Sequence, residues 1–115
     1  MAVTIYHNPR CGKSRATLKL LEARGIRPTV IEYLKTPPDA ALLKRLLRLL
    51  GLPARKLLRS KEKEYKAAGL ADPKLGEDKI IAAMVKHPIL IERPIVVAGS
   101  KAALGRPPEA VLKIL

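Results

Sequence analysis

The sequence predicts an α/β protein with a four-stranded mixed sheet and an α-helical insertion. Short β-branched segments alternate with helical patterns along the 115 residues, and the chain opens with a strand–helix–strand unit. With 48% apolar residues, the chain can bury one modest core, so we expect residues 1–115 to form a single domain. Aliphatic side chains must fill that core, because the sequence contains neither Phe nor Trp.

The first unit consists of a strand over 3–6, a helix over 14–24 that Gly25 ends, and a second strand over 28–34. We expect Ala16 and the leucines of the helix to form its apolar side. Two strands joined through a helix pair in parallel with a right-handed crossover. The loop between the first strand and its helix is where sheets of this kind usually bind ligands.

The middle of the chain reads as helical. Thr36 is expected to cap a helix over 37–50 that begins with prolines and ends at Gly51. Short helices and turns are expected within 53–75, and another helix over 77–86. These segments form the predicted insertion.

The last part of the chain contains two apolar segments, 89–91 and 94–97, separated by only two residues. So short a link predicts an antiparallel hairpin. Residues 98–108 read as a turn-rich loop, and residues 109–115 as a closing helix. The resulting order of elements is that of a thioredoxin-like fold with an α-helical insertion between its halves.

The formal net charge of +13 favours anionic partners, whether small oxyanions, nucleic acid or an acidic protein. No apolar run is long enough to cross a membrane, and the first residues lack a signal-peptide pattern. A single cysteine fits a reducing compartment, so we expect a cytoplasmic protein. One Cys and two distant His do not form a metal-ligand set, and we expect no metal.

Cys11 is the main candidate for chemistry. It stands where a helix begins, and the unpaired N–H groups of a helix start favour a thiolate or a bound oxyanion. Lys13, Arg10 and Arg15 add positive charge, so we expect a depressed pKa for the thiol. Gly12 would let a ligand approach the backbone closely. The alternative is an inert cysteine buried for packing.

Two neighbours are expected to support this loop. His7 could form a hydrogen bond within the loop and strengthen the field that favours the thiolate, or it could simply cap the end of the strand. Ser14 is the expected N-cap of the helix, with its hydroxyl close to the thiol.

Four segments carry a resemblance to a known family: YHNPRCGKSRATLKLLEARGI, LLRS, HPILIERPIVV and ALGRPPE. They are similar, in order and spacing over almost the full length, to the glutaredoxin-coupled arsenate reductases, whose fold is thioredoxin-like. The resemblance implies that Cys11 is the catalytic cysteine and that Arg59, Arg93 and Arg106 hold the oxyanion. It also implies that Pro94 follows a cis peptide bond.

In the mechanism that the resemblance implies, Cys11 attacks arsenate and glutathione or another external thiol then reduces the arsenic to arsenite. A glutaredoxin resolves the mixed disulfide left on Cys11. A chain with no second cysteine must use an external resolving thiol. We expect no bound cofactor, and a monomer.

Several alternatives remain open. A member of this family could act on another oxyanion or on a small mixed disulfide. Spx-like regulatory proteins, which bind RNA polymerase, are similar in fold but typically have a second cysteine where this chain has Ser14. A cysteine phosphatase needs a wider Cys–Arg spacing than that between Cys11 and Arg15. Nucleic-acid binding is disfavoured, because three Tyr are the only aromatic residues.

Overall fold

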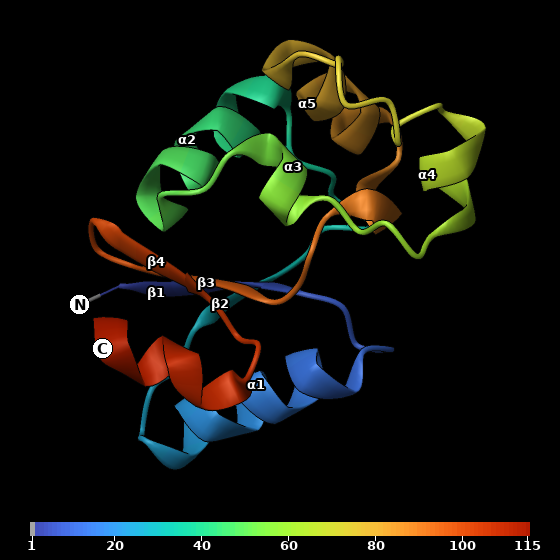
Figure 1. The fold of residues 1–115 in the computed structure, drawn as a ribbon. Helices are drawn as coiled ribbons and strands as arrows, with labels where there is room; N and C mark the ends of the chain where they lie inside the picture. Colours follow the sequence, from blue (N-terminus) through green and yellow to red (C-terminus); the bar gives the residue numbers. More distant parts are fainter. Residues whose placement is uncertain (1) are drawn as a thin grey trace. The chain divides into compact units, whose positions relative to one another are not determined.

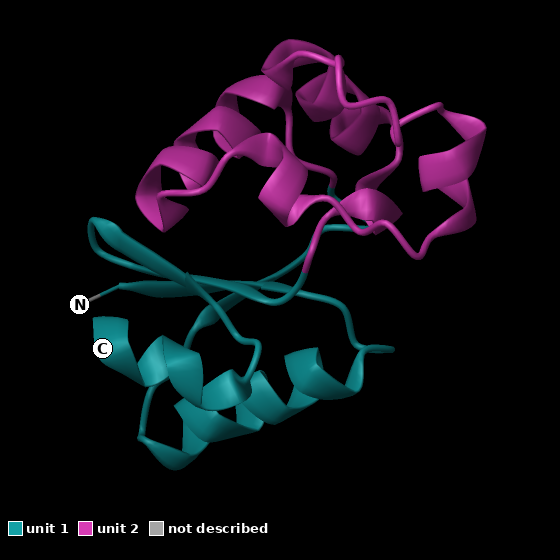
Figure 2. Cartoon of the chain, viewed as in Figure 1, with its two compact units in different colours: residues 1–36, 93–115 teal, residues 37–92 magenta. Residues whose placement is uncertain are grey.

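The computed structural model describes residues 2–115, which form a four-stranded sheet and several helices (Figure 1). The chain divides into two compact units (Figure 2). Unit 1 comprises the described residues up to Thr36 together with Arg93–Leu115, and unit 2 comprises Pro37–Glu92. Unit 2 is the helical insertion that the sequence predicts.

The sheet lies in unit 1 and has the strand order β2-β1-β3-β4. Strand β1 pairs in parallel with β2, whereas the β1–β3 and β3–β4 pairs are antiparallel. This is the mixed sheet that the sequence predicts, and the parallel pair confirms the strand–helix–strand unit. The strands are β1 (Val3–His7), β2 (Thr29–Glu32), β3 (Ile95–Ala98) and β4 (Lys101–Leu104).

Helix α1 (Gly12–Ala23) and the 3₁₀ helix η2 (Pro108–Ile114) lie side by side against the sheet (Figure 1). The expected closing helix is therefore present, but in the tighter 3₁₀ form. An aliphatic cluster holds this layer together, as the composition requires; its buried members are Val3, Ile5, Leu21, Val96, Ala98 and Val111. Ala16 was expected on the apolar side of α1, yet it is exposed, and Ser14 and Thr17 are buried there instead.

Unit 2 is helical throughout. Its first helix begins one turn later than expected, because the carboxylate of Asp39, rather than Thr36, caps it by accepting a 2.8 Å hydrogen bond from the Leu42 N–H. Gly51 ends this helix in the left-handed conformation, as predicted. The helices are α2 (Ala40–Leu50), α3 (Ala54–Leu57), α4 (Lys63–Ala67), α5 (Glu77–Lys86) and the 3₁₀ helix η1 (Pro88–Leu90).

The predicted hairpin between 89–91 and 94–97 is wrong. Most of the first segment belongs to η1, and Ile91 makes only an isolated bridge to Leu58. The real hairpin joins β3 and β4 through a turn at Gly99, within the segment expected to be a loop. The sheet has four strands, as expected. Its fourth strand is Lys101–Leu104 (KAAL), and residues 89–91 contribute none.

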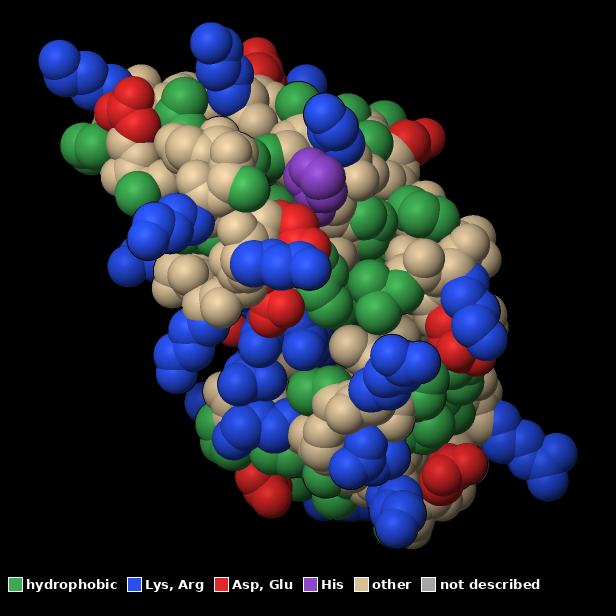
Figure 3. Space-filling model, turned by 90° about the vertical axis from the view of Figure 1, so that its right-hand side faces the viewer, with side chains coloured by type: hydrophobic (Ala, Val, Ile, Leu, Met, Phe, Trp, Pro, Cys, Tyr) green, Lys and Arg blue, Asp and Glu red, His purple; other side chains and the backbone are tan. Residues whose placement is uncertain are grey.

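The part of the chain that the structure describes contains no helix long and apolar enough to cross a membrane. Lys and Arg side chains are distributed across the face shown in Figure 3, with acidic side chains between them. The positive charge is therefore not confined to one element.

Candidate functional site

Cys11 is the N-cap residue of α1, at the end of the loop that follows β1. Its backbone is extended, with φ −94° and ψ 123°, and its N–H donates a 3.0 Å hydrogen bond to the Asn8 carbonyl. Cys11 is partly exposed, so it is not a cysteine buried for packing, which was the alternative to a reactive thiol. The sulfur therefore stands at the start of a twelve-residue helix.

The pKa of the Cys11 thiol lies below its ordinary value. Burial by itself would raise this pKa, because it disfavours the thiolate. Hydrogen bonds from the backbone N–H groups of Ser14 and Lys13 and from the Arg93 side chain outweigh that effect, and the charge of Arg93 adds to them. The lowered pKa expected from the helix start is thus present.

The charged side chains of the loop contribute differently from the expectation. Lys13 acts on Cys11 through its backbone N–H, and Arg93, from a distant part of the sequence, supplies the charge. The Arg15 guanidinium instead donates to the Pro9 carbonyl at 3.0 Å. A Cβ at Gly12 would meet only the end of the Arg15 side chain, at 3.7 Å, so the protein itself does not require glycine there.

Ser14 is buried in the first turn of α1 and is not its N-cap, which corrects the expectation. Its Oγ lies 2.6 Å from His7 Nδ1 and accepts a 3.0 Å hydrogen bond from the Asn8 N–H. The pKa of His7 is lowered, chiefly by burial and also by Arg15, against an opposing effect of Glu32. His7 thus forms the expected hydrogen bond within the loop, but its environment favours the neutral ring.

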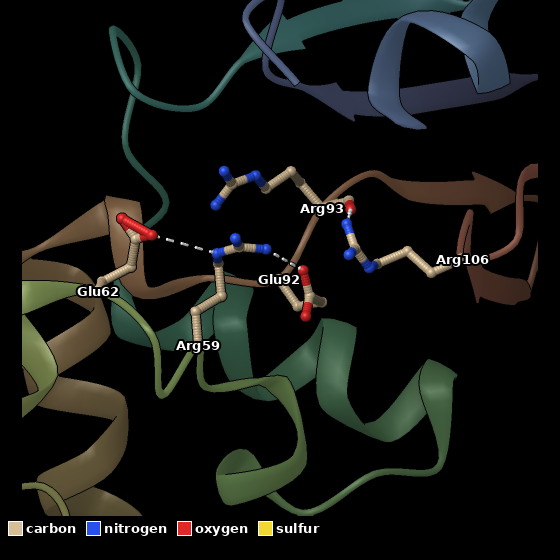
Figure 4. A network of polar contacts seen from close by, with 5 residues as sticks. All are labelled: Arg59, Glu62, Glu92, Arg93 and Arg106. Atoms are coloured by element: carbon tan, nitrogen blue, oxygen red, sulfur yellow. Dashed lines mark hydrogen bonds and ion pairs between the residues drawn. The ribbon is translucent and has the colours of Figure 1, made fainter. Parts of the chain in front are cut away.

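Arg93 is 9% exposed, and the peptide bond between it and Pro94 is cis, as the family resemblance implies. The Arg106 side chain donates to the Arg93 carbonyl oxygen at 3.4 Å (Figure 4). Pro94 also accepts a 2.9 Å hydrogen bond from the Gly105 N–H. A Cβ at Gly105 would overlap Thr17 and the Pro94 ring, so this packing requires glycine.

Unit 1 therefore brings several of the predicted site residues to one end of α1: Cys11, Gly12, Lys13, Ser14, His7 and Arg93 with its neighbours Pro94 and Arg106. Arg93 was expected between two strands. It instead follows an irregular segment and precedes β3.

Arg59 belongs to unit 2, where two carboxylates surround it. Its Nη1 donates to Glu92 Oε1 at 2.5 Å, and its Nε lies 3.6 Å from Glu62 Oε2 (Figure 4). The sequence reasoning missed both partners. The i,i+3 spacing of Arg59 and Glu62 was a weak signal, whereas no local signal pairs Arg59 with Glu92, which lies 33 residues away.

Within residues 2–115, no group of three or more His, Cys, Asp or Glu side chains could hold a metal ion. The chemistry that the described site offers is that of a stabilised thiolate beside a guanidinium. Such an arrangement suits nucleophilic attack on an anionic, tetrahedral substrate.

The sequence model of the ArsC family matches residues 6–114. The chain is 51% identical over 114 residues to an "Arsenate reductase" of Neisseria meningitidis serogroup A, covering 98% of this chain and 97% of the relative. It is 58% identical over 114 residues to "Uncharacterized protein YfgD" of Escherichia coli K12, covering 98% and 96%.

A solved structure described as an arsenate reductase from Vibrio cholerae is 56% identical and superposes with a TM-score of 0.97. The match covers 100% of this chain and 98% of the Vibrio cholerae chain. The fold is thus the α/β, thioredoxin-like fold that the sequence predicts.

Proposed function

Because the chain belongs to the ArsC family, we propose that it reduces arsenate to arsenite with Cys11 as the nucleophile. The observation that carries this proposal is the position of a partly exposed thiol at the N-cap of α1, where backbone N–H groups and Arg93 lower its pKa. A thiolate, not a thiol, is the species that attacks.

In the first step, the Cys11 thiolate attacks arsenic and one arsenate oxygen departs as water after taking up protons from solvent. A sulfur–arsenic bond replaces an arsenic–oxygen bond, and arsenic remains pentavalent. Guanidinium donors stabilise the charge on the remaining oxygens while this exchange occurs.

In the second step, the thiolate of glutathione attacks the Cys11 sulfur. The electron pair of the sulfur–arsenic bond passes to arsenic, which leaves as arsenite, and a mixed disulfide remains on Cys11. A glutaredoxin thiol then takes the glutathionyl group and releases the Cys11 thiolate. The single cysteine of the chain supports dependence on an external thiol, and these reductants belong to the cytoplasm.

We assign the oxyanion to Arg93, Arg106 and Arg59, following the family resemblance. The contact between Arg93 and the thiol supports the assignment of Arg93. Arg106 supports the same segment through the Arg93 carbonyl. For the loop, Ser14 and Lys13 supply N–H donors, and His7 keeps Ser14 in place.

The decisive experiment measures arsenate-dependent NADPH oxidation with glutathione, glutaredoxin and glutathione reductase present. We expect turnover by the wild-type protein and none above background for Cys11→Ser, because a hydroxyl is not ionised at neutral pH. Lys19→Ala is the matched control, since it removes one exposed charge from the same helix, and it should retain wild-type turnover.

Equal rates for the wild type and Cys11→Ser would remove Cys11 from the mechanism. Turnover that persists when glutaredoxin is omitted, but not when glutathione is omitted, would keep the arsenate chemistry and reject the proposed resolving partner.

A further inference from the structure

The pairing of Glu92 with Arg59 is built into the backbone of unit 2. Leu58 and Ile91 form an antiparallel bridge. On either side of it, the Arg59 N–H donates to the Leu90 carbonyl at 2.7 Å, and the Glu92 N–H donates to the Leu57 carbonyl at 2.8 Å. Two backbone segments are thus joined just where the two charged side chains begin, so the backbone itself holds Arg59 and Glu92 close to each other.

The contact between the side chains is short and partly shielded from water. Arg59 Nη1 donates to Glu92 Oε1 at 2.5 Å, and the side chains are 17% and 23% exposed (Figure 4). The second carboxylate, that of Glu62, lies farther from the guanidinium, at 3.6 Å from Nε. An anion that binds Arg59 therefore meets a positive charge flanked by two negative ones.

A carboxylate beside an anion-binding guanidinium changes which anions are accepted. An ionised carboxylate can only accept hydrogen bonds, through about four lone-pair sites. Hydrogen arsenate and sulfate are both doubly charged and tetrahedral near neutral pH, but only hydrogen arsenate carries a hydroxyl that can donate. Next to Glu92, hydrogen arsenate gains a charge-assisted hydrogen bond, whereas sulfate meets only repulsion.

We propose that Glu92 is a specificity-determining residue, which accepts a hydrogen bond from the protonated oxygen of hydrogen arsenate held by Arg59 and rejects fully deprotonated oxyanions such as sulfate. This inference rests on the proposed function, in which Arg59 contacts the oxyanion. A site that hydrogen-bonds a substrate hydroxyl discriminates strongly against an analogue that lacks it.

The test measures the dissociation constants of arsenate and sulfate by calorimetry, at mildly alkaline pH, for the wild type, Glu92→Gln and Glu62→Gln. The wild type should prefer arsenate by about tenfold or more, the loss expected when a hydrogen bond to a charged group is absent. Glu92→Gln should abolish most of this preference. The amide oxygen can stay on Arg59 while the NH₂ group turns an acceptor into a donor.

Glu62→Gln is the matched control because it removes the same charge beside the same guanidinium. It should tighten the binding of both anions by similar factors and leave their ratio unchanged, since the anions carry equal charge. Thermal unfolding of each variant, together with its Cys11 alkylation rate, verifies that the fold is retained.

Three results would overturn the inference: a wild type that does not discriminate between the two anions, an unchanged ratio in Glu92→Gln, or an equal change of the ratio in Glu62→Gln. The proposed function fails separately, if the wild type binds arsenate with the expected preference but does not reduce it in the coupled assay.

Discussion

The reactivity of Cys11 depends on Arg93, which lies far from it in the sequence. The Arg93 side chain donates a hydrogen bond to the thiolate and adds its charge. In Arg93→Ala both contributions are lost, so the pKa of Cys11 should rise toward its ordinary value. The alkylation rate at neutral pH should fall roughly three- to tenfold, because less thiolate is present. The pH profile of iodoacetamide alkylation measures both quantities, and arsenate should also bind more weakly.

Arg10→Ala is the control for this prediction. Arg10 is adjacent to Cys11 in the sequence, but its side chain is exposed and is not among the groups that lower the Cys11 pKa. Its alkylation profile should match that of the wild type. A shift as large as that of Arg93→Ala would mean that loop charge in general, rather than the Arg93 contact, sets the pKa.

At the same scale, the local pattern around Cys11 was sufficient to place the thiol at a helix start and to predict its low pKa. It was not sufficient to rank the cations, because Arg10, Lys13 and Arg15 are near in sequence, yet none of their side chains is among the groups that lower the Cys11 pKa. The prediction that Ser14 is the N-cap was also wrong; it was made because a serine before an apolar run is typical of an N-cap. Its hydroxyl is instead held by His7 and Asn8 beneath the first turn.

At the scale of elements, the start of α2 offers a direct test of capping. Asp39→Ala removes the carboxylate that accepts the Leu42 N–H, and the free energy of unfolding should fall by about 1 kcal/mol. Urea denaturation measures the change. Thr36→Ala, at the residue that the sequence suggested as the cap, should be nearly neutral, and a loss equal to that of Asp39→Ala would contradict the observed helix start.

The misread hairpin shows why strands near the end of the chain were difficult to predict. Residues 89–91 have the composition of a strand, but Pro88 begins a 3₁₀ turn, and the backbone of Glu92 pairs with Leu57 in a different segment. Strand β4 shows the opposite case, a strand whose composition does not predict one. Its sequence KAAL has low strand propensity, and it forms because Gly99 turns the chain back so that Lys101–Leu104 pair with β3.

At the scale of the whole molecule, the order of strands and helices was enough to predict the thioredoxin-like fold, even though one strand was misplaced. Order survives such an error because the strand–helix–strand unit and the helical insertion are recognisable from hydrophobic periodicity together with Gly and Pro at the element boundaries. The pairing of Arg59 with Glu92 could not be predicted in this way, since it depends on a bridge between segments distant in the sequence.

The net charge of +13 predicts that the reaction of Cys11 with anionic reagents depends on salt. A positive field speeds the arrival of anions, and added salt screens it over a Debye length of about 10 Å at 0.1 M ionic strength. The rate at which anionic iodoacetate alkylates Cys11 should therefore fall several-fold, roughly, as NaCl is raised from low to near-molar concentration.

Neutral iodoacetamide provides the comparison, because it reacts with the same thiolate without being attracted by charge. Its rate should change little over the same salt range. If both reagents respond alike, salt acts on the thiol pKa or on the structure, and the field does not steer small anions to Cys11.

The position of Cys11 as the N-cap of α1 has a consequence for the release of a bound partner. The same N–H groups and guanidinium that favour attack also stabilise the sulfur when it departs with an electron pair, which makes Cys11 a good leaving group. A disulfide formed at this sulfur would be more oxidising than one formed at an ordinary thiol, since reduction restores the favoured thiolate. A mixed disulfide on Cys11 would therefore be reduced readily, and the protein would not accumulate in the oxidised form.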